Sequence, residues 1–367
     1  MTRKEILFFA DRLPPLIGGM EMHAQYFIDY FSNHLQFPIS AIITKDITQR
    51  DCLISRGITS LIAISALPSL FDPAIVFFNS GRWIEELSQL RKLFPRAKFI
   101  YRTGGNEISK APLTNYNIAD HSLRQNYWVQ QLNNSINLLI TNSAYTETRL
   151  RKLGLNCLFE RCVGGVNTSV LKLTDNLTNR NYPIIFCAAR FVQYKNHSLM
   201  LSVIRALALK GYKFKLKLAG DGSLLKQAKE QVSKENLSSF VKFLGVLDNI
   251  EACKEIAKAN IYMQFSKDEI IQVLGGSYIH SEGMGRSILE AITAGTYIIA
   301  GKSGALSEII TPNLGLLLDL NDLNKTTYQI EEVLKQPPSK LPFVDRFCWN
   351  KIFSRYEELF STMTENK

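Results

Sequence analysis

Short apolar runs rich in Ile, Val, Leu and Phe alternate with longer segments of helical period along this 367-residue chain. A strand that helices cover on both faces is apolar throughout, so the alternation predicts parallel α/β sheets. In the first half we expect strands at Ile6–Phe9, Ile39–Ile43, Ile75–Phe78, Phe99–Tyr101 and Leu138–Thr141, and helices at His23–Phe31, Ile84–Leu93, Ser122–Leu132 and Ala144–Leu153.

The alternation stops and then restarts, which indicates two domains. The stretch 174–181 is polar and poor in packing residues, as linkers are. Beyond it we expect strands at Ile184–Ala188, Phe214–Leu218, Val241–Leu244, Ile261–Phe265 and Tyr297–Ala300. We therefore predict two Rossmann-like, doubly wound domains, 1–173 and 182–344, facing one cleft. The chain is long enough for each domain to bury its own core.

The C-terminal segment 345–367 carries an apolar stripe. Its large apolar residues recur at helical spacing: Trp349, Ile352, Phe353, Tyr356 and Phe360. We predict a last helix that crosses back and packs on the N-terminal domain.

Charge and cysteine content exclude several classes of protein. The formal charge is +10, but there is no long basic run and no basic-aromatic signature, which disfavours nucleic acid as a partner. A positive surface suits anionic nucleotides and anionic lipid headgroups. The six cysteines are scattered without a Cys-x-x-Cys pair, which argues against a zinc site or disulfide framework and favours a reducing compartment.

The sequence predicts a cytoplasmic location, and peripheral contact with the inner face of the cell membrane stays open as an alternative. The N-terminal apolar run ends at Asp11 and is too short for the core of a signal peptide, so we expect a buried strand there. No segment approaches the ~18 uninterrupted apolar residues that a spanning helix needs.

The stretch 280–295 places two carboxylates, Glu282 and Glu290, around a glycine-rich turn. Gly283 and Gly285 let backbone N–H groups approach a ligand, and the following helix has a partial positive charge at its N-terminus. We expect Glu282 in the turn and Glu290 in the helix, so that each holds hydroxyls at one end of the ligand. The pattern suits a nucleotide sugar, although this spacing of glutamates also arises by chance.

Cations and glycines near strand ends supply further candidates. Arg190 and Lys195 follow the first strand of the second domain, where a diphosphate needs charge compensation; a solvated basic loop is the alternative. Gly18 and Gly19 follow the first strand of the other domain and offer backbone donors at a helix start. Gly222 belongs to a glycine turn that we expect to shape the cleft wall.

Together these motifs resemble the family-4 retaining glycosyltransferases of GT-B architecture. The matching pieces cover nearly the whole chain in the family's order: Gly18–Gly19, Val163–Asn167, Arg190 with Lys195, Gly220–Gly222, Phe243–Gly245, Glu282 with Glu290, and Gly304–Glu308. Their ordered occurrence is more specific than any single motif.

The resemblance implies an enzyme that moves a sugar from a UDP- or GDP-sugar to a glycan or lipid-linked glycan acceptor in cell-envelope polysaccharide biosynthesis. It implies retention of configuration, without a metal or other cofactor. Arg190 and Lys195 look like the pair that stabilises the departing diphosphate, and Glu282 like the residue that grips the transferred sugar. Glu290 looks like the acceptor of hydrogen bonds from the ribose. The donor-binding set implied is Gly18, Gly19, Gly222, Gly283, Met284, Gly285, Arg286 and Glu290.

The chain departs from the family pattern in the first lobe and in one long segment. Family members often carry a His-Gly motif where this chain has 101–107, so Arg102 or Asn106 is the candidate for contact with the sugar or acceptor. The segment 267–280 is longer than the family leads us to expect. It either shapes the donor-sugar pocket or forms a surface loop, and His280 at its end is a further candidate contact.

Three alternatives stay open. An aromatic group in the first lobe, Tyr116, Tyr127 and Trp128, either meets a lipid-linked acceptor at a membrane or packs within helices. The enzyme could be a GT-B nucleotide-sugar epimerase, which needs no acceptor. It could also be a catalytically silent sugar-nucleotide-binding partner subunit, although such a member would be expected to lose the cations or glutamates that this chain keeps. A nicotinamide dehydrogenase is disfavoured, because no Gly-x-Gly-x-x-Gly follows a strand.

Overall fold

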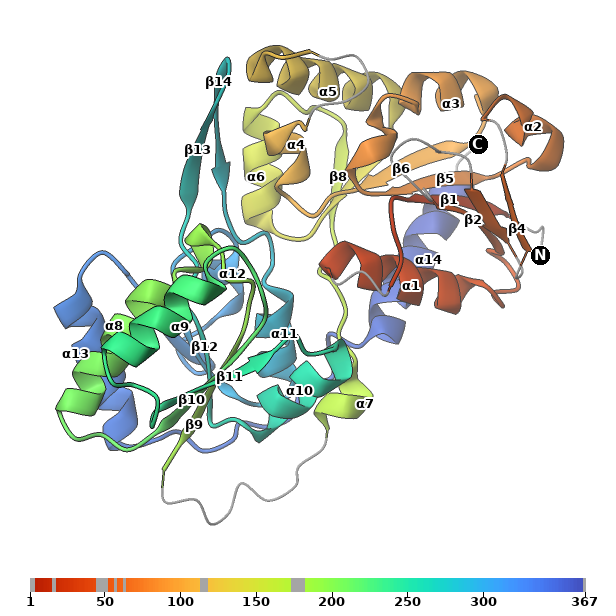
Figure 1. Cartoon of the computed structure of the whole chain (residues 1–367). Helices are drawn as coiled ribbons and strands as arrows, with labels where there is room; N and C mark the ends of the chain where they lie inside the picture. The colour runs from red at the N-terminus through yellow and green to blue at the C-terminus, as the bar shows by residue number, and fades with distance from the viewer. Residues whose placement is uncertain are drawn as a thin grey trace. The chain divides into compact units, whose positions relative to one another are not determined.

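The computed structural model describes residues 4–14, 18–43, 52–55, 58–61, 64–112, 118–172 and 182–365. The chain divides into two compact units (Figure 1). The first comprises Met1–Gly164, Ile270–Ile279 and Trp349–Lys367, and the second comprises Gly165–Glu269 and His280–Cys348. The expected linker at 174–181 lies outside the described residues.

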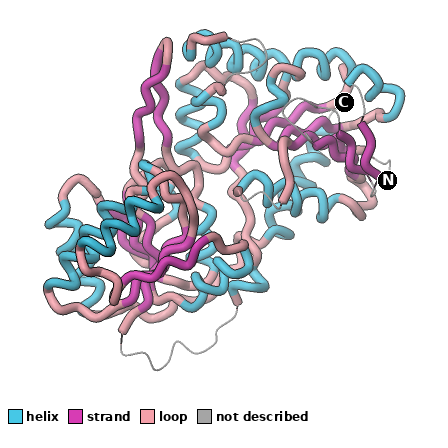
Figure 2. Tube along the Cα trace, in the orientation of Figure 1, coloured by secondary structure: helices cyan, strands magenta, loops and turns pink. Residues whose placement is uncertain are grey.

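The first unit is built on an eight-stranded sheet in the order β4-β3-β2-β1-β5-β6-β7-β8. Figure 2 distinguishes strands from helices by colour. Six neighbouring strands, β2-β1-β5-β6-β7-β8, pair in parallel, whereas β3 pairs antiparallel with both β2 and β4 at one edge. β1 and β5 are buried along their whole length, as strands with helices on both faces must be. The strands are β1 Ile6–Ala10, β2 Ile39–Ile43, β3 Cys52–Ser55, β4 Ile58–Leu61, β5 Ile75–Asn79, β6 Lys98–Arg102, β7 Leu138–Thr141 and β8 Leu158–Arg161.

Helices flank this sheet, and the C-terminal helix α14 belongs to the same unit. The apolar stripe of α14 is buried against α1, where Phe27, Phe31, Phe353 and Phe360 share one core cluster. The α-helices are α1 Gly19–Phe31, α2 Leu67–Leu70, α3 Leu87–Leu93, α4 Glu107–Lys110, α5 His121–Ser135, α6 Ala144–Lys152 and α14 Trp349–Glu365.

The second unit contains a six-stranded parallel sheet in the order β11-β10-β9-β12-β15-β16. Its strands are β9 Ile184–Ala188, β10 Lys215–Ala219, β11 Val241–Gly245, β12 Ile261–Gln264, β15 Tyr297–Gly301 and β16 Gly315–Leu318. Its α-helices are α7 Thr168–Leu171, α8 His197–Leu209, α9 Leu225–Lys234, α10 Asn249–Lys258, α11 Arg286–Thr293, α12 Leu306–Ile309 and α13 Leu323–Lys335. The predicted α/β class, with two largely parallel sheets, is confirmed.

The strand order reverses at one place in each sheet. The chain moves outward from β1 through β2 and then returns to β5, and it moves outward from β9 through β10 and β11 and then returns to β12. In open α/β sheets, ligands bind outside the carboxyl ends of the strands at such a switch point. The ends of β1 and β5, and those of β9 and β12, are therefore the places to look for sites.

The long segment 267–280 forms a two-stranded sheet of β13 (Glu269–Val273) and β14 (Gly276–His280). Residues 270–279 group with the first unit because the turn contacts the start of α5. The His121 N–H donates to the Leu274 carbonyl oxygen at 2.8 Å, and the rings of His121 and Tyr278 stack with centroids 5.7 Å apart. Gly275 has a φ of +80°, and a Cβ there would overlap the Asp120 carboxylate. The close fit of this turn thus requires glycine.

One segment groups differently from the predicted domain boundary, and helix packing is the alternative that holds for Trp128. Residues 165–172, expected in the first domain, belong to the second unit because α7 packs on α10 and α11. The aromatic group of the first lobe is not an exposed patch: Trp128 is 1% exposed and the side chains of His121 and Arg124 are also buried. Tyr116 lies outside the described residues.

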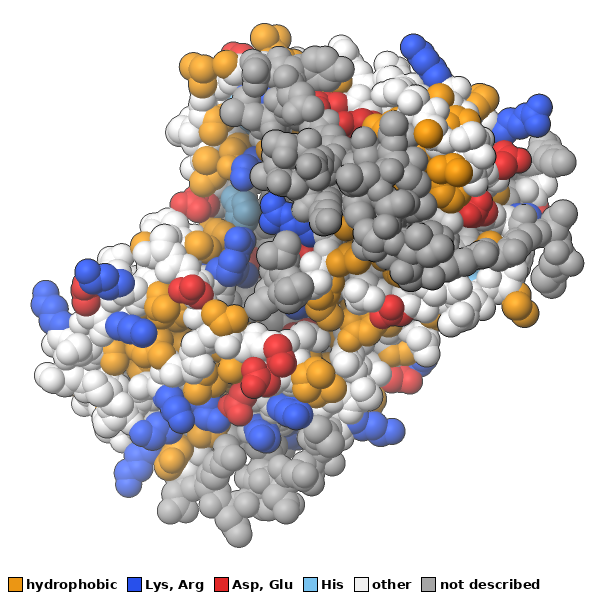
Figure 3. All heavy atoms as spheres, turned by 45° about the vertical axis from the view of Figure 1, so that its right-hand side comes forward, with side chains coloured by type: hydrophobic (Ala, Val, Ile, Leu, Met, Phe, Trp, Pro, Cys, Tyr) orange, Lys and Arg blue, Asp and Glu red, His pale blue; other side chains and the backbone are white. Residues whose placement is uncertain are grey.

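Two features bear on contact with a membrane: the length and apolarity of the helices, and the distribution of basic side chains on the surface. Within the described parts of the chain, no helix is both long and apolar enough to cross a bilayer. Lys and Arg side chains are spread among apolar and acidic ones on the face in Figure 3.

Candidate active site

The loop after β9 carries both predicted cations and is packed against a glycine turn. The Phe191 N–H donates to the Asp221 carbonyl oxygen at 2.8 Å, and the Leu224 N–H donates to the Phe191 carbonyl oxygen at 2.9 Å. Gly222 has a φ of +150°, and a Cβ there would come within 2.5 Å of the Phe191 oxygen. Glycine therefore lets the turn approach the loop closely, and this packing fixes the backbone next to Arg190.

Lys195 and Glu282 form an ion pair in the second unit. The Lys195 ammonium donates to Oε1 of Glu282, and the Ser266 hydroxyl donates to the same oxygen at 2.8 Å. The two charged side chains are 12% and 11% exposed. Lys195 follows β9 and Ser266 follows β12, so the pair lies at the switch point of this sheet.

The pair keeps both groups charged in spite of their burial. Burial alone raises the pKa of Glu282, but the Lys195 charge and the hydrogen bonds from Lys195 and Ser266 outweigh it and lower that pKa. Burial alone lowers the pKa of Lys195, but Glu282 raises it overall. An ammonium has three N–H donors, and the bond to Glu282 uses one of them.

Tyr194 is a residue of this loop that the sequence analysis missed. Its hydroxyl accepts a hydrogen bond from Nη2 of Arg190 at 3.2 Å, and Nζ of Lys195 lies 5.2 Å from the ring centroid. The ring of His280 is 4.2 Å from it. Tyr194 thus brings together both predicted cations and the candidate His280. The position of Tyr194 between Arg190 and Lys195 in the sequence is the signal that could have predicted its contact with both cations.

Glu290 lies on α11, which begins after the glycine-rich turn. Gly285 caps this helix with a φ of +70°, and the turn residues Gly283 and Met284 are half-buried. Oε1 of Glu290 accepts a hydrogen bond from Nδ2 of Asn249 at 2.9 Å and lies 3.5 Å from Nε of Arg286.

Glu290 is a carboxylate held in a protein interior. The residue is only 3% exposed. Burial raises its pKa, while the Arg286 charge and the bond from Asn249 oppose that rise. Asn249, at the start of α10, is the second residue that the sequence analysis missed, because nothing in the motif points to a residue 41 positions away.

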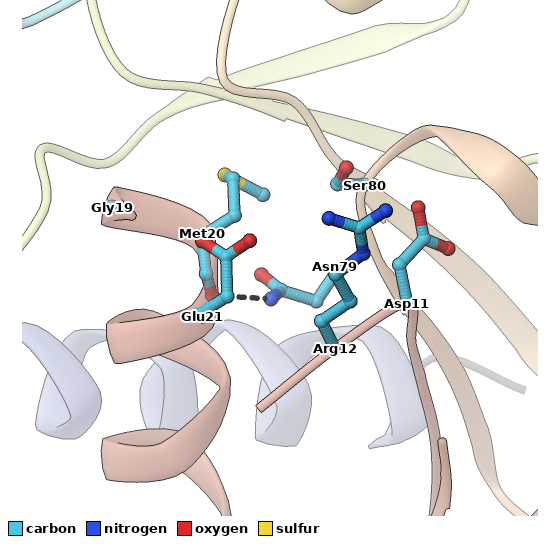
Figure 4. A pocket seen from close by; sticks show the side chains of 7 residues that line it. All are labelled: Asp11, Arg12, Gly19, Met20, Glu21, Asn79 and Ser80. Atoms are coloured by element: carbon cyan, nitrogen blue, oxygen red, sulfur yellow. Dashed lines mark hydrogen bonds between the residues drawn. The ribbon is translucent and has the colours of Figure 1, made fainter. Parts of the chain in front are cut away.

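The remaining predicted residues lie in the first unit, where the ends of β1 and β5 border a pocket of about 270 Å³ (Figure 4). Polar side chains surround it, including two carboxylates, a guanidinium and an amide. The lining residues are Asp11, Arg12, Gly19, Met20, Glu21, Asn79 and Ser80. Gly18 caps α1 and Gly19 opens it, and a Cβ on Gly19 would meet no atom. Gly19 is thus accessible backbone in this pocket.

Arg102 and Asn106 do not line the pocket. Arg102 is 4% exposed, and its Nη1 donates to Oδ1 of Asn79 at 3.3 Å and contacts Sδ of Met20 at 3.1 Å. Arg102 is therefore a buried residue that contacts two of the lining residues, Asn79 and Met20. Asn106 accepts a hydrogen bond from Nη1 of Arg149 at 3.4 Å.

Among the described residues, no three His, Cys, Asp or Glu side chains are grouped so that they could hold a metal ion.

This chain is similar to known glycosyltransferases. The family model "Glycosyl transferases group 1" matches residues 172–345. A GDP-mannose-dependent monoacylated alpha-(1-6)-phosphatidylinositol monomannoside mannosyltransferase of Corynebacterium glutamicum is 25% identical over 276 residues, which cover 71% of this chain and 67% of that protein.

Solved structures share the fold at low sequence identity. Sucrose-phosphate synthase of Thermosynechococcus elongatus superposes with a TM-score of 0.76 at 16% identity, covering 100% of both chains. Anabaena Alr3699/HepE in complex with UDP superposes with a TM-score of 0.72 at 14% identity, covering 98% of this chain and 100% of that one.

The fold, with its two largely parallel sheets and their switch points, is that of the GT-B glycosyltransferases. Residues 172–345, a little under half of the chain, match the family of group 1 glycosyl transferases, and this match supports glycosyl transfer as the class of activity.

Proposed function

We propose that this protein is a retaining, metal-independent glycosyltransferase that moves a sugar from a UDP- or GDP-sugar to a glycan or lipid-linked glycan acceptor in cell-envelope polysaccharide biosynthesis. It works in the cytoplasm, in peripheral contact with the membrane. The ion pair of Lys195 with Glu282, beside Arg190 and Tyr194, is the observation that carries the proposal. The relative from Corynebacterium glutamicum is a GDP-mannose-dependent mannosyltransferase that acts on a phosphatidylinositol monomannoside, and it supports both the donor class and a lipid-linked acceptor.

The donor binds to the second unit. In the reaction the bond between the sugar C1 and the diphosphate oxygen breaks, the acceptor oxygen bonds to C1, and its proton leaves with the nucleoside diphosphate. Negative charge grows on the diphosphate as the bond breaks. Arg190 and Lys195 stabilise that charge, since cations fixed before the reaction need no reorganisation during it.

The two glutamates hold the ends of the donor. Glu282 accepts hydrogen bonds from hydroxyls of the transferred sugar, and Lys195 and Ser266 orient its carboxylate. Glu290 accepts hydrogen bonds from the ribose, in an orientation fixed by Asn249. The N-terminus of α11, with Gly283, Met284 and Gly285, offers N–H groups to the donor. No bound cofactor is needed, because the nucleotide sugar is itself a substrate.

The acceptor binds in the pocket of the first unit. Asp11, Glu21, Asn79 and Ser80 are acceptors and donors of the kind that recognise sugar hydroxyls. Gly19, which the family resemblance places among the donor-binding residues, offers a backbone N–H at the start of α1.

Nucleotide release by the purified protein tests the function. UDP- and GDP-sugars are supplied with and without glycan and glycolipid acceptors, and the anomeric configuration of any product is read by NMR. Acceptor-dependent release with retained configuration is the expected result. Sugar isomerisation without an acceptor would identify an epimerase instead, and nucleotide-sugar binding without turnover would identify a silent partner subunit.

A further inference from the structure

Asp268 lies between β12 and β13, and its carboxylate reaches the loop that follows β15. Oδ1 of Asp268 accepts a hydrogen bond from the Ser303 hydroxyl at 2.7 Å and another from the Gly304 N–H at 3.0 Å. Hydrogen bonds to an ionised acceptor are about twice as strong as neutral ones. A single carboxylate oxygen thus holds two consecutive residues of this loop.

The same loop holds the backbone of Glu282. The Glu282 N–H donates to the Ser303 hydroxyl oxygen at 3.2 Å, and the Ala305 N–H donates to the Glu282 carbonyl oxygen at 2.9 Å. Gly304 has a φ of +52°, and a Cβ there would overlap that carbonyl oxygen. Both backbone polar groups of Glu282 are therefore bonded to the loop that Asp268 anchors.

We infer that Asp268 is a positioning residue for Glu282. Through Ser303 and Gly304 it fixes the backbone from which the Glu282 carboxylate reaches Lys195 and Ser266. The inference rests on the proposed function, in which that carboxylate holds the transferred sugar. Asp268 belongs to the segment 267–280, which is longer than the family resemblance leads one to expect.

Asp268 also lines a cavity of about 420 Å³. The effect of losing a negative charge from this cavity must therefore be separated from the effect of releasing the Ser303–Ala305 loop. Lys267, Lys302 and Asp319 line the same cavity. Asp319 supplies a matched control because its carboxylate accepts hydrogen bonds from the backbone and side chain of Asn321, within its own turn. Removing it deletes a carboxylate from the cavity and leaves the Ser303–Ala305 loop intact.

Kinetics and hydrogen exchange test the inference together. Asp268→Ala is expected to lower kcat for nucleotide release by about tenfold, while the donor KM changes less than about twofold, because the sugar is held less well in the transition state. Ser303→Ala is expected to match it. Asp268→Asn is expected to keep most of the activity, since an amide oxygen has two lone pairs for the same two donors. Asp319→Ala is expected to behave as the unmodified enzyme.

Hydrogen–deuterium exchange gives a readout that does not depend on activity. The Glu282 and Ala305 amides are expected to exchange faster in Asp268→Ala than in the unmodified protein or in Asp319→Ala. Unchanged exchange would overturn the inference. So would equal losses of kcat in Asp268→Ala and Asp319→Ala, or an Asp268→Asn variant as slow as Asp268→Ala. If the unmodified protein released no nucleotide from any donor, the proposed function would fall, and exchange would still decide whether Asp268 holds the Glu282 backbone.

Discussion

Lys195 donates a hydrogen bond to the carboxylate of Glu282, a residue 87 positions away in the sequence, and both side chains are nearly buried. A buried charge is costly unless it is paired. The pair therefore has two consequences, one for turnover and one for the dependence of stability on pH.

Replacement of Lys195 by methionine should lower turnover by about 100-fold or more. That is the typical effect of removing one fixed group that stabilises developing negative charge. Nucleotide release under saturating donor measures it. In a double-mutant cycle with Glu282→Gln, the two losses should be far from additive, because each change disrupts the same pair. Additive losses would show that the two residues act independently.

The pair should also make the protein less stable in acid. The pKa of Glu282 is lowered in the fold, so its contribution is fully present above the ordinary carboxyl value of 4.5 and is lost as pH falls through the folded value. Urea unfolding at several pH values measures this. The Glu282→Gln variant should lose less stability than the unmodified protein over that interval, and an identical pH profile would contradict the expectation.

Glu290 should determine whether the enzyme distinguishes ribose from 2′-deoxyribose in the donor. Its carboxylate lies in the interior, where a hydrogen bond to a charged group contributes roughly 1.5–3 kcal/mol. Glu290→Gln should therefore raise the donor KM by about 10- to 100-fold. It should also reduce the preference for ribose over 2′-deoxyribose nucleotide sugars.

Glu230→Gln, on the exposed face of α9, is the control for the Glu290 variant. A preference for ribose that survives in Glu290→Gln would place the ribose elsewhere in the second unit.

The central strands could be predicted from the sequence because they are apolar on both faces. The prediction for β9 matches its observed bounds, Ile184–Ala188, and that for β1 ends one residue early. β8 was missed because it is a sheet-edge strand: Leu158 and Arg161, at its two ends, are exposed, so it lacks the continuous apolar run. Secondary structure that packing does not bury leaves a weak signal in the pattern.

The contacts within the site are harder to predict from the sequence than the strands are. The spacing of residues along the chain does not determine which side chains come into contact in the fold. The cations Arg190 and Lys195 were expected from their place after a strand. Their contacts with Tyr194 depend on the turn that carries all three. Asn249 on α10 reaches Glu290 only through the packing of α10 on α11, which no local motif encodes.

His197 should make the fold sensitive to acid between about pH 6.5 and pH 4. Its ring stacks on Phe191 with centroids 4.1 Å apart, and burial together with the Lys195 charge lowers its pKa from 6.5 to about 4. Within that interval the unfolded chain binds a proton that the folded chain does not, so stability falls as pH falls. The loss should approach roughly 3 kcal/mol, at 1.36 kcal/mol per pKa unit.

A His197→Phe variant tests that assignment because phenylalanine can stack on Phe191 but cannot titrate. Urea unfolding at pH 7 and pH 5 should show a smaller difference in the free energy of unfolding for the variant than for the unmodified protein. Equal differences would mean that other groups cause the acid sensitivity.

Gly304 should tolerate no side chain, because a Cβ would overlap the Glu282 carbonyl oxygen in addition to straining a backbone with a φ of +52°. Gly211, after α8, separates the two effects: its φ is +84°, but a Cβ there would meet no atom within 4 Å. Gly211→Ala should cost about 1–2 kcal/mol of unfolding free energy, the usual penalty for a left-handed conformation. Gly304→Ala should cost clearly more and should also slow nucleotide release, because the backbone of Glu282 has to move. If the two variants were equally stable and equally active, the loop around Gly304 would be free to relax, and the Glu282 backbone would not be held by it.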